Sequence, residues 1–185
     1  MQTIRTKEEE MKEKPIIIAI VGPSGSGKTT LSRFAAKALG YNLVCSYTTR
    51  PMREGEADGV DHYFVSEDDM PPKEKMLAYT CFGGYHYWTT KDQIEGVCIY
   101  VIDEDGVRML KRRNCTFVAV YVTRDNIDVD KERMDRDKGR KPLDGYSYVV
   151  NNKGSLENFL FTGTNTIHLA CSLLNFAIST KLMNI

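Results

Sequence analysis

The sequence predicts an α/β fold with a doubly wound parallel sheet, and three observations lead to this class. Apolar runs typical of strands buried on both faces occupy residues 16–21, 97–102 and 117–122. Helical spacing of apolar residues follows the first run, and a glycine-rich turn joins the two. Strands alternating with helices are typical of open parallel sheets, whose sites lie at the carboxyl ends of the strands.

The first predicted unit is a strand, a glycine loop and a helix. After the strand at 16–21, apolar side chains recur at helical spacing between Leu31 and Leu39, and Gly40 supplies a stop signal. Residues 42–46 have the composition of a second short strand. Residues 1–14 are charged and have no apolar core, so we expect a flexible N-terminal arm and no signal peptide.

The middle of the chain, residues 46–90, predicts a small antiparallel insertion. Residues 62–66 have strand composition. Two aromatic-rich runs, 79–82 and 85–88, flank Gly83-Gly84, and a glycine pair between two such runs indicates a hairpin.

The strand–helix alternation resumes after this insertion. We expect buried strands at 97–102, 117–122 and 148–150, a helix at 106–113 and a closing helix at 167–182. Residues 15–185 would then form one domain, a size that suits a single core.

The composition excludes several classes of protein. Acidic and basic residues balance to a formal net charge of zero, which argues against broad nucleic-acid binding. Five cysteines without a C-x-x-C pair suggest reduced thiols, not a disulfide framework or a zinc site. The apolar stretches near 169–178 are too short and interrupted to span a bilayer. We therefore expect a cytoplasmic protein with no nucleic-acid or membrane partner, either a monomer or a homodimer.

The turn after the first strand carries the pattern G-x-x-x-x-G-K-[ST] at Gly22, Gly27, Lys28 and Thr29. Glycines let successive backbone N–H groups point at phosphates, and the following helix directs its positive dipole end at the same anion. Lys28 would reach the terminal phosphates, and the Thr29 hydroxyl would hold Mg²⁺. The residues expected to bind ATP are Ser24, Gly25, Ser26, Gly27, Lys28, Thr29 and Thr30.

A second motif resembles the monophosphate-binding segment of guanylate kinases. Residues 48–59 read T-T-R-x-x-R-x-G-E-x-x-G, and residues 82–90 look like the hairpin of that family. With the phosphate loop, the resemblance covers about residues 15–105. It implies a P-loop nucleoside monophosphate kinase that transfers the γ-phosphate of ATP to GMP or dGMP with Mg²⁺, and that has a nucleoside-monophosphate-binding insertion and a short lid.

The resemblance also implies which residues bind the acceptor. Thr89 is expected to donate to the guanine carbonyl. The other residues are expected to bind the acceptor phosphate, with His62 and Tyr63 as alternatives for one position: Ser46, Arg50, Arg53, His62, Tyr63 and Tyr87. Two arginines three residues apart on a polar loop can clamp a dianion independently of any resemblance. For Thr89, a helix N-cap is an equal alternative.

Three positions depart from the family pattern. Ala78 stands where the family has a glutamate that accepts from guanine, and Val101 stands where it has the first aspartate of D-x-D; Trp88 replaces a glycine. A guanine donor left without a partner costs about 1–3 kcal/mol, so base selectivity is expected to be weak. Glu104 and Asp105 are neighbouring carboxylates that could compensate.

Phosphoryl transfer requires positioning and charge stabilisation rather than a nucleophilic side chain. Asp103, which ends a buried strand, would order Mg²⁺, and its alternative is a helix N-cap. Residues 124–146 would form the lid, with Arg136 and Arg140 as catalytic arginines. Asp137 and Lys141 could instead form an i,i+4 pair on an ordinary solvated helix.

Two further functions stay open at this point. The protein could phosphorylate another acceptor, such as a different nucleoside monophosphate, a deoxynucleotide or a sugar phosphate. It could also be a non-catalytic binding domain, although such a domain predicts a decayed phosphate loop and this loop is intact.

Overall fold

The fold was determined from a computed structural model, which describes residues 14–125, 129, 131–138 and 140–183. The arm expected at 1–14 therefore lies outside the described residues, apart from Lys14.

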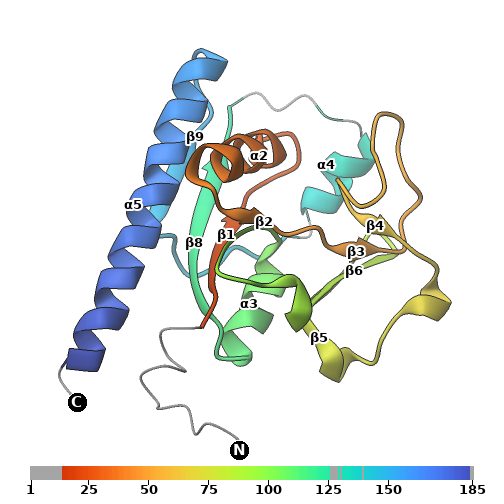
Figure 1. The fold of residues 1–185 in the computed structure, drawn as a ribbon. Helices are drawn as coiled ribbons and strands as arrows, with labels where there is room; N and C mark the ends of the chain where they lie inside the picture. The colour runs from red at the N-terminus through yellow and green to blue at the C-terminus, as the bar shows by residue number, and fades with distance from the viewer. Residues whose placement is uncertain (1–13, 126–128, 130, 139, 184–185) are drawn as a thin grey trace, which may run out of the picture.

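The main sheet consists of five parallel strands in the order β2-β7-β1-β8-β9 within the described chain (Figure 1). Along the chain these are β1 (Ile16–Val21), β2 (Asn42–Leu43), β7 (Val97–Val101), β8 (Thr116–Thr123) and β9 (Tyr148–Asn151). The two strands beside β1 are β7 and β8, so β1 is central and all six of its residues are buried. The predicted parallel sheet is confirmed.

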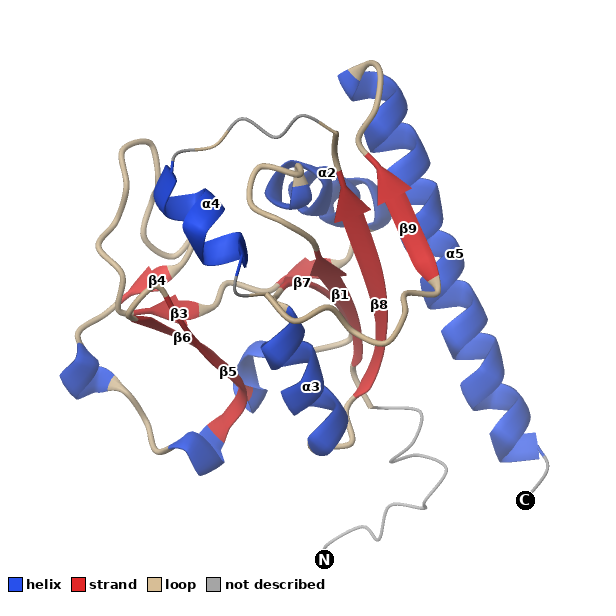
Figure 2. Cartoon of the chain, turned by 180° about the vertical axis from the view of Figure 1, so that it is seen from behind, coloured by secondary structure: helices blue, strands red, loops and turns tan. Residues whose placement is uncertain are grey.

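Helices cover the two faces of this sheet differently. On one side lie α2 (Lys28–Leu39) and the long α5 (Leu156–Met183), and on the other lies α3 (Glu104–Arg112) (Figures 1 and 2). Because strand side chains alternate, Ile16, Ile18 and Ile20 join the core under α2 and α5. Ile17 and its odd-numbered neighbours join the core with α3 and the small sheet.

The insertion forms a second sheet in the order β4-β3-β6-β5. Its strands are β3 (Tyr47–Thr48), β4 (Tyr63–Phe64), β5 (Met76–Phe82) and β6 (Tyr85–Thr90), with short 3₁₀ turns at Glu67–Asp69, Lys73–Lys75 and Lys91–Gln93. The β5–β6 hairpin turns at Gly83 and Gly84, as predicted. The expectation of a purely antiparallel insertion is wrong, because β3 and β4 pair in parallel. The long loop between these two strands crosses over and so brings β4 in beside β3 in the same direction.

Several predicted element boundaries shift. The strand expected at 42–46 is regular only at Asn42–Leu43. The closing helix, expected at 167–182, begins at Leu156. This early start packs α5 on α2 at Gly163, where an added Cβ would lie 2.5 Å from Cδ1 of Leu31. Neither α5 nor any other helix in the described part of the chain has an apolar stretch sufficient to cross a membrane.

One further helix, α4 (Lys131–Lys138), lies on the opposite side of the molecule from α5 (Figures 1 and 2). Its eight residues are almost entirely charged or polar. The helix falls within the residues 124–146 expected to form a lid, and that role stays a prediction.

Candidate functional site

The phosphate loop runs from the end of β1 into α2 and is built on close backbone approaches. Gly22 has φ +151°, and a Cβ there would lie 2.1 Å from the Val122 carbonyl oxygen. Gly27 has φ +99°, caps α2 and lies against Asn152 and Phe159. A side chain fits at neither position, which explains why the motif has glycine at both.

The loop is held by contacts to three other side chains. Nζ of Lys28 donates to the carbonyl oxygens of Gly22 and Pro23 at 2.7 Å each. Nδ2 of Asn152 donates to the Ser26 carbonyl at 3.0 Å. The third contact comes from α4, whose Asp137 carboxylate accepts from the Ser24 N–H at 2.7 Å.

An arginine site lies on the polar loop after β3. Nη1 and Nη2 of Arg50 donate to the two carboxylate oxygens of Glu56, each at 2.9 Å. The backbone N–H of Arg53 donates to the same carboxylate at 2.8 Å. The buried Nε of Arg50 has no hydrogen-bond partner among the described residues. Glu56 therefore orders the loop, and Arg50 keeps a donor for an incoming anion.

Electrostatics fix the charges of this arginine site. Burial is the largest single influence on Arg50 and would lower its pKa, but the hydrogen bond to Glu56, the Glu56 charge and nearby Tyr87 together raise that pKa. Burial would likewise raise the pKa of Glu56, but its hydrogen bonds to Arg50 and to the Arg53 backbone, together with the two arginine charges, lower it. Burial, followed by the nearby Arg50 charge, lowers the pKa of His62, whose Nδ1 lies 2.9 Å from Oγ of Ser46.

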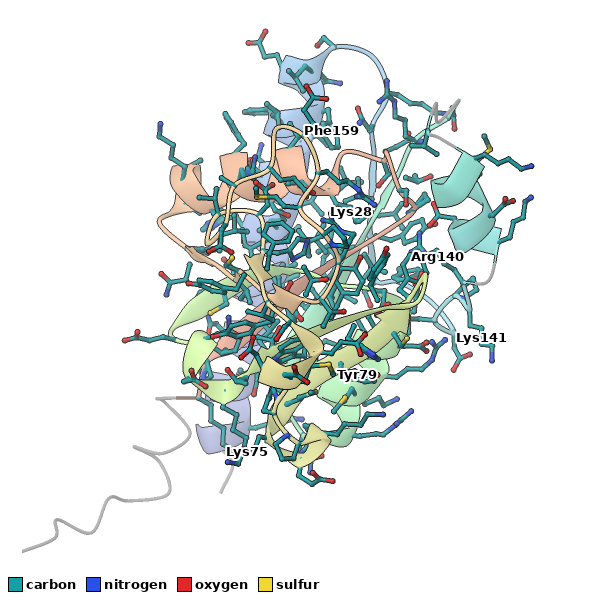
Figure 3. The ribbon with its side chains drawn as sticks, turned by 90° about the vertical axis from the view of Figure 1, so that its right-hand side faces the viewer. Lys28, Lys75, Tyr79, Arg140, Lys141 and Phe159 are labelled. Carbon is teal, nitrogen blue, oxygen red and sulfur yellow. The ribbon has the colours of Figure 1, made fainter. Side chains whose placement is uncertain are left out.

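One cavity of about 310 Å³ brings the two sites together. Figure 3 labels three of its lining residues, Lys28, Tyr79 and Arg140, which lie near the middle of the molecule. The predicted site residues that line it are Ser24, Lys28, Thr29, Ser46, Arg50, Arg53, His62, Tyr87, Asp103 and Arg140. A phosphate-binding loop and an arginine pair thus face a single space.

The remaining loop residues lie mostly on the other side of α2's first turn. A second cavity is lined there by Gly25, Gly27 and Thr30, together with Lys28 and Thr29. Arg124, Asn152 and Phe159 complete much of its wall. Ser26 is buried beneath the loop. Lys28 and Thr29 line both cavities, which therefore meet at the first turn of α2.

Two predicted acceptor residues do not line the shared cavity. Tyr63 points to the opposite side of its strand from His62, and its ring packs on Tyr47 with centroids 5.0 Å apart. Thr89 is fully buried, and its hydroxyl donates to the Tyr100 hydroxyl. The structure therefore places His62, and not Tyr63, beside the arginine site.

Asp103 takes the second of the two roles considered for it, and the first stays a prediction. It is the N-cap of α3, where its carboxylate accepts from the Gly106 N–H at 2.8 Å. It also lines the shared cavity. Burial raises the pKa of Asp103 despite that hydrogen bond. The half-buried Asp103 carboxylate and the Thr29 hydroxyl line the same cavity and offer the oxygen donors that Mg²⁺ prefers, so these residues fit the ion.

The expected catalytic arginines differ in what the structure shows. The Arg140 guanidinium contacts the Glu104 carboxylate through Nη2 at 2.5 Å and Nε at 3.1 Å. The Tyr146 hydroxyl donates to the same carboxylate at 3.3 Å. Arg136 lies on α4, and its side chain is outside the described residues.

Two apolar residues, Ala78 and Val101, also line the shared cavity, and Ala78 pairs with Thr89 across the β5–β6 hairpin. Glu104, a candidate for reading the base, is instead bound to Arg140.

Sequence reasoning missed two contacts of the site. It took Asp137 for a partner of Lys141 on a solvated helix, but α4 ends at Lys138 and Asp137 contacts Ser24. It also missed the ion pair between Glu104 and Arg140. Charge pattern alone could not have found either contact, because each joins segments far apart in the sequence.

Comparison with known proteins identifies similar chains. The profile of the family described as guanylate kinase matches residues 12–174. The guanylate kinase of Helicobacter pylori is 30% identical over 128 residues, which are 64% of this chain and 62% of that protein. The guanylate kinase of Chlamydia trachomatis is 37% identical over 110 residues, 54% of each chain. The matches thus span less than two thirds of these relatives' lengths.

A solved structure supports the architecture. The crystal structure of guanylate kinase from Anaplasma phagocytophilum matches with a TM-score of 0.62 and 17% identity. The match covers 88% of this chain and 87% of that chain, so the folds agree over nearly their full lengths.

Proposed function

The chain belongs to the guanylate kinase family, and from that premise we propose that it is an ATP-dependent nucleoside monophosphate kinase, a phosphotransferase acting on GMP or dGMP. The observation that carries the proposal is the shared cavity, which Lys28 lines together with Arg50 and Arg53. Transfer of a phosphoryl group requires donor and acceptor phosphates to be held in line, and two opposed cationic sites on one cavity can do so.

The loop residues would bind the triphosphate. The Ser24 N–H already donates to a carboxylate, so this backbone group is directed at an anion acceptor. On nucleotide binding, Lys28 would exchange the carbonyl oxygens of Gly22 and Pro23 for phosphate oxygens and draw charge from the γ-phosphate.

The arginine site would hold the acceptor. Arg50, fixed by Glu56, offers its buried Nε, and Arg53 lines the same wall of the cavity. A guanidinium binds phosphate with directional, charge-assisted hydrogen bonds, which would orient the attacking oxygen. His62, Ser46 and Tyr87 would complete this phosphate site.

Mg²⁺ supplies charge neutralisation on the transferring phosphates when it is bound. Thr29 and Asp103 are the residues that would hold it or its waters.

The test is a coupled assay of ADP release over a panel of ribo- and deoxynucleoside monophosphates. We expect turnover of GMP and dGMP, and losses of at least a hundredfold in kcat/KM for Lys28→Ala and Arg50→Ala. Arg112→Ala is the control, because Arg112 is exposed in the last turn of α3 and does not line the shared cavity. The absence of turnover with every acceptor in the panel would disprove the proposal.

A second candidate, a kinase with a different phosphorylated acceptor, is favoured by the apolar residues Ala78 and Val101 on the shared cavity. Ala78 and Val101 present no acceptor to the N–H groups of guanine, and Thr89 is bound to Tyr100. The same panel decides between them: equal kcat/KM for GMP and a pyrimidine nucleotide would support relaxed base choice, and a hundredfold preference for GMP would exclude it.

A further inference from the structure

A carboxylate from α4 contacts the phosphate loop. Asp137 accepts from the Ser24 backbone N–H at 2.7 Å through Oδ2 and from the Ser24 hydroxyl at 3.2 Å through Oδ1. Both carboxylate oxygens are therefore used on one loop residue, 113 positions earlier in the chain.

This contact differs from those of the other carboxylates on the same cavity. Glu56 is paired with Arg50, and Asp103 caps α3. Asp137 instead engages a backbone N–H of the glycine loop, and the nearest arginine beyond α4, Arg140, gives its guanidinium to Glu104. A loop built to bind an anion is thus in contact with an anion from its own chain.

We propose that Asp137 is an intramolecular competitor of nucleotide phosphate, which occupies the Ser24 donors in the nucleotide-free protein and must leave before a triphosphate binds. The inference rests on the proposed triphosphate site at this loop. The Ser24 N–H cannot serve the carboxylate and a phosphate oxygen together, and two anions at hydrogen-bonding distance of one group repel each other. The apparent affinity for the triphosphate therefore falls as the fraction of molecules in which Asp137 contacts Ser24 rises.

The surrounding contacts define what moves. The segment that follows α4 is fixed to α3, because Arg140 is bound to Glu104 and Arg108 donates to the carbonyl oxygens of Lys141 and Pro142. Release of Asp137 therefore turns α4 about this fixed end while the chain stays attached. Because Ser24 and Asp137 both line the shared cavity, displacement of α4 opens the loop side of that cavity.

The test is calorimetric titration of MgATP into the full-length protein and its variants. Asp137→Asn keeps the shape of the side chain and removes its charge, and Asp137→Ala removes both acceptors. A charge-assisted hydrogen bond contributes enough that its loss from the competing state should tighten MgATP binding about tenfold in both variants. The matched control is Asp135→Asn on the same helix, where the carboxylate is paired with Lys138 at 2.6 Å and is about half exposed, and its affinity should equal that of the wild type.

A second measurement tests the contact between Asp137 and Ser24 in the absence of nucleotide. Amide hydrogen exchange at residues 22–26 and 131–138 should be faster in Asp137→Asn than in the wild type, and unchanged at these residues in Asp135→Asn. Exchange in the C-terminal half of α5, which lies on the opposite side of the molecule from α4 (Figure 1), should be unchanged in all three proteins, which shows that the variants are folded.

If the wild type binds MgATP and both Asp137 variants bind it equally well or more weakly, Asp137 is not a competitor. That result would not contradict the proposed function. A wild type that does not bind MgATP would disprove the triphosphate site itself and the competitor with it. Equal tightening by Asp135→Asn would assign the effect to the general charge of α4 and would also overturn the proposal.

Discussion

The Arg140 guanidinium and the Glu104 carboxylate form a buried ion pair in which both carboxylate oxygens are used. Only 12% of the Arg140 side chain and 5% of the Glu104 side chain are exposed. The pair joins the segment after α4 to the first turn of α3, and the Tyr146 hydroxyl adds a third contact. A candidate catalytic arginine is therefore held by a carboxylate at the edge of the shared cavity.

Replacing Glu104 by glutamine should destabilise the protein. Arg140 would remain buried without a counter-charge, and removing one partner of such a pair costs about 3–5 kcal/mol. Urea denaturation should show a lower free energy of unfolding with an unchanged m-value. The control is Asp105→Asn, which breaks the neighbouring, exposed pair with Arg108 and should change stability by less than about 1 kcal/mol. Equal losses in the two variants would contradict the prediction.

Lysine in place of Arg50 should weaken acceptor binding selectively. The substitution keeps the charge but loses the planar contact to Glu56 and the Nε donor. Since a hydrogen bond to a charged group is worth about 1.5–3 kcal/mol, KM for the monophosphate should rise at least about tenfold while KM for ATP stays constant. Steady-state kinetics in both substrates checks this. The matched variant, Arg112→Lys, changes an exposed arginine that does not line the shared cavity and should leave both constants unchanged. A parallel rise in KM for ATP would refute the prediction.

Local patterns in the sequence predicted the architecture and much of the site. The apolar run at 16–21, the glycine loop and the helix after it are consecutive, so their signals do not depend on distant parts of the chain. The glycine pair at 83–84 gave the β5–β6 hairpin for the same reason. Because the phosphate loop and the arginine motif both resemble segments of one kinase family, Lys28 and Arg50 could be expected on one cavity.

Long-range contacts could not be predicted in this way. Whether an arginine such as Arg140 faces a substrate or a carboxylate depends on which residue the fold brings opposite, and here that is Glu104, 36 positions earlier. The orientation of the Thr89 side chain depends on the register shift in β5 between Met76 and Ala78, and on the Tyr100 hydroxyl to which it donates. The contact of Asp137 with Ser24 depends on where α4 ends.

Alanine at Gly22 should prevent stable folding of the phosphate loop. The added Cβ would lie 2.1 Å from a backbone oxygen, that of Val122, which no side-chain movement relieves. Gly40→Ala is the control, because φ there is also positive, at +68°, but no atom lies within 4 Å of the new Cβ. It should lose only about 1–2 kcal/mol from the left-handed conformation. Thermal unfolding should separate the two variants clearly, and similar midpoints would show that Val122 moves aside.

His62 should make stability depend on pH in the mildly acidic range. Burial and then the Arg50 charge lower its pKa below the ordinary value of 6.5, so as the pH falls the unfolded chain takes up this proton before the folded protein does. The free energy of unfolding contributed by His62 is therefore complete above about pH 6.5 and is lost as the pH falls toward the lowered pKa. Urea denaturation between pH 5 and 8 should show this decline in the wild type and a shallower one in His62→Gln. Ser46→Ala, which keeps the imidazole, should retain the wild-type slope; an identical slope in His62→Gln would mean that other groups govern it.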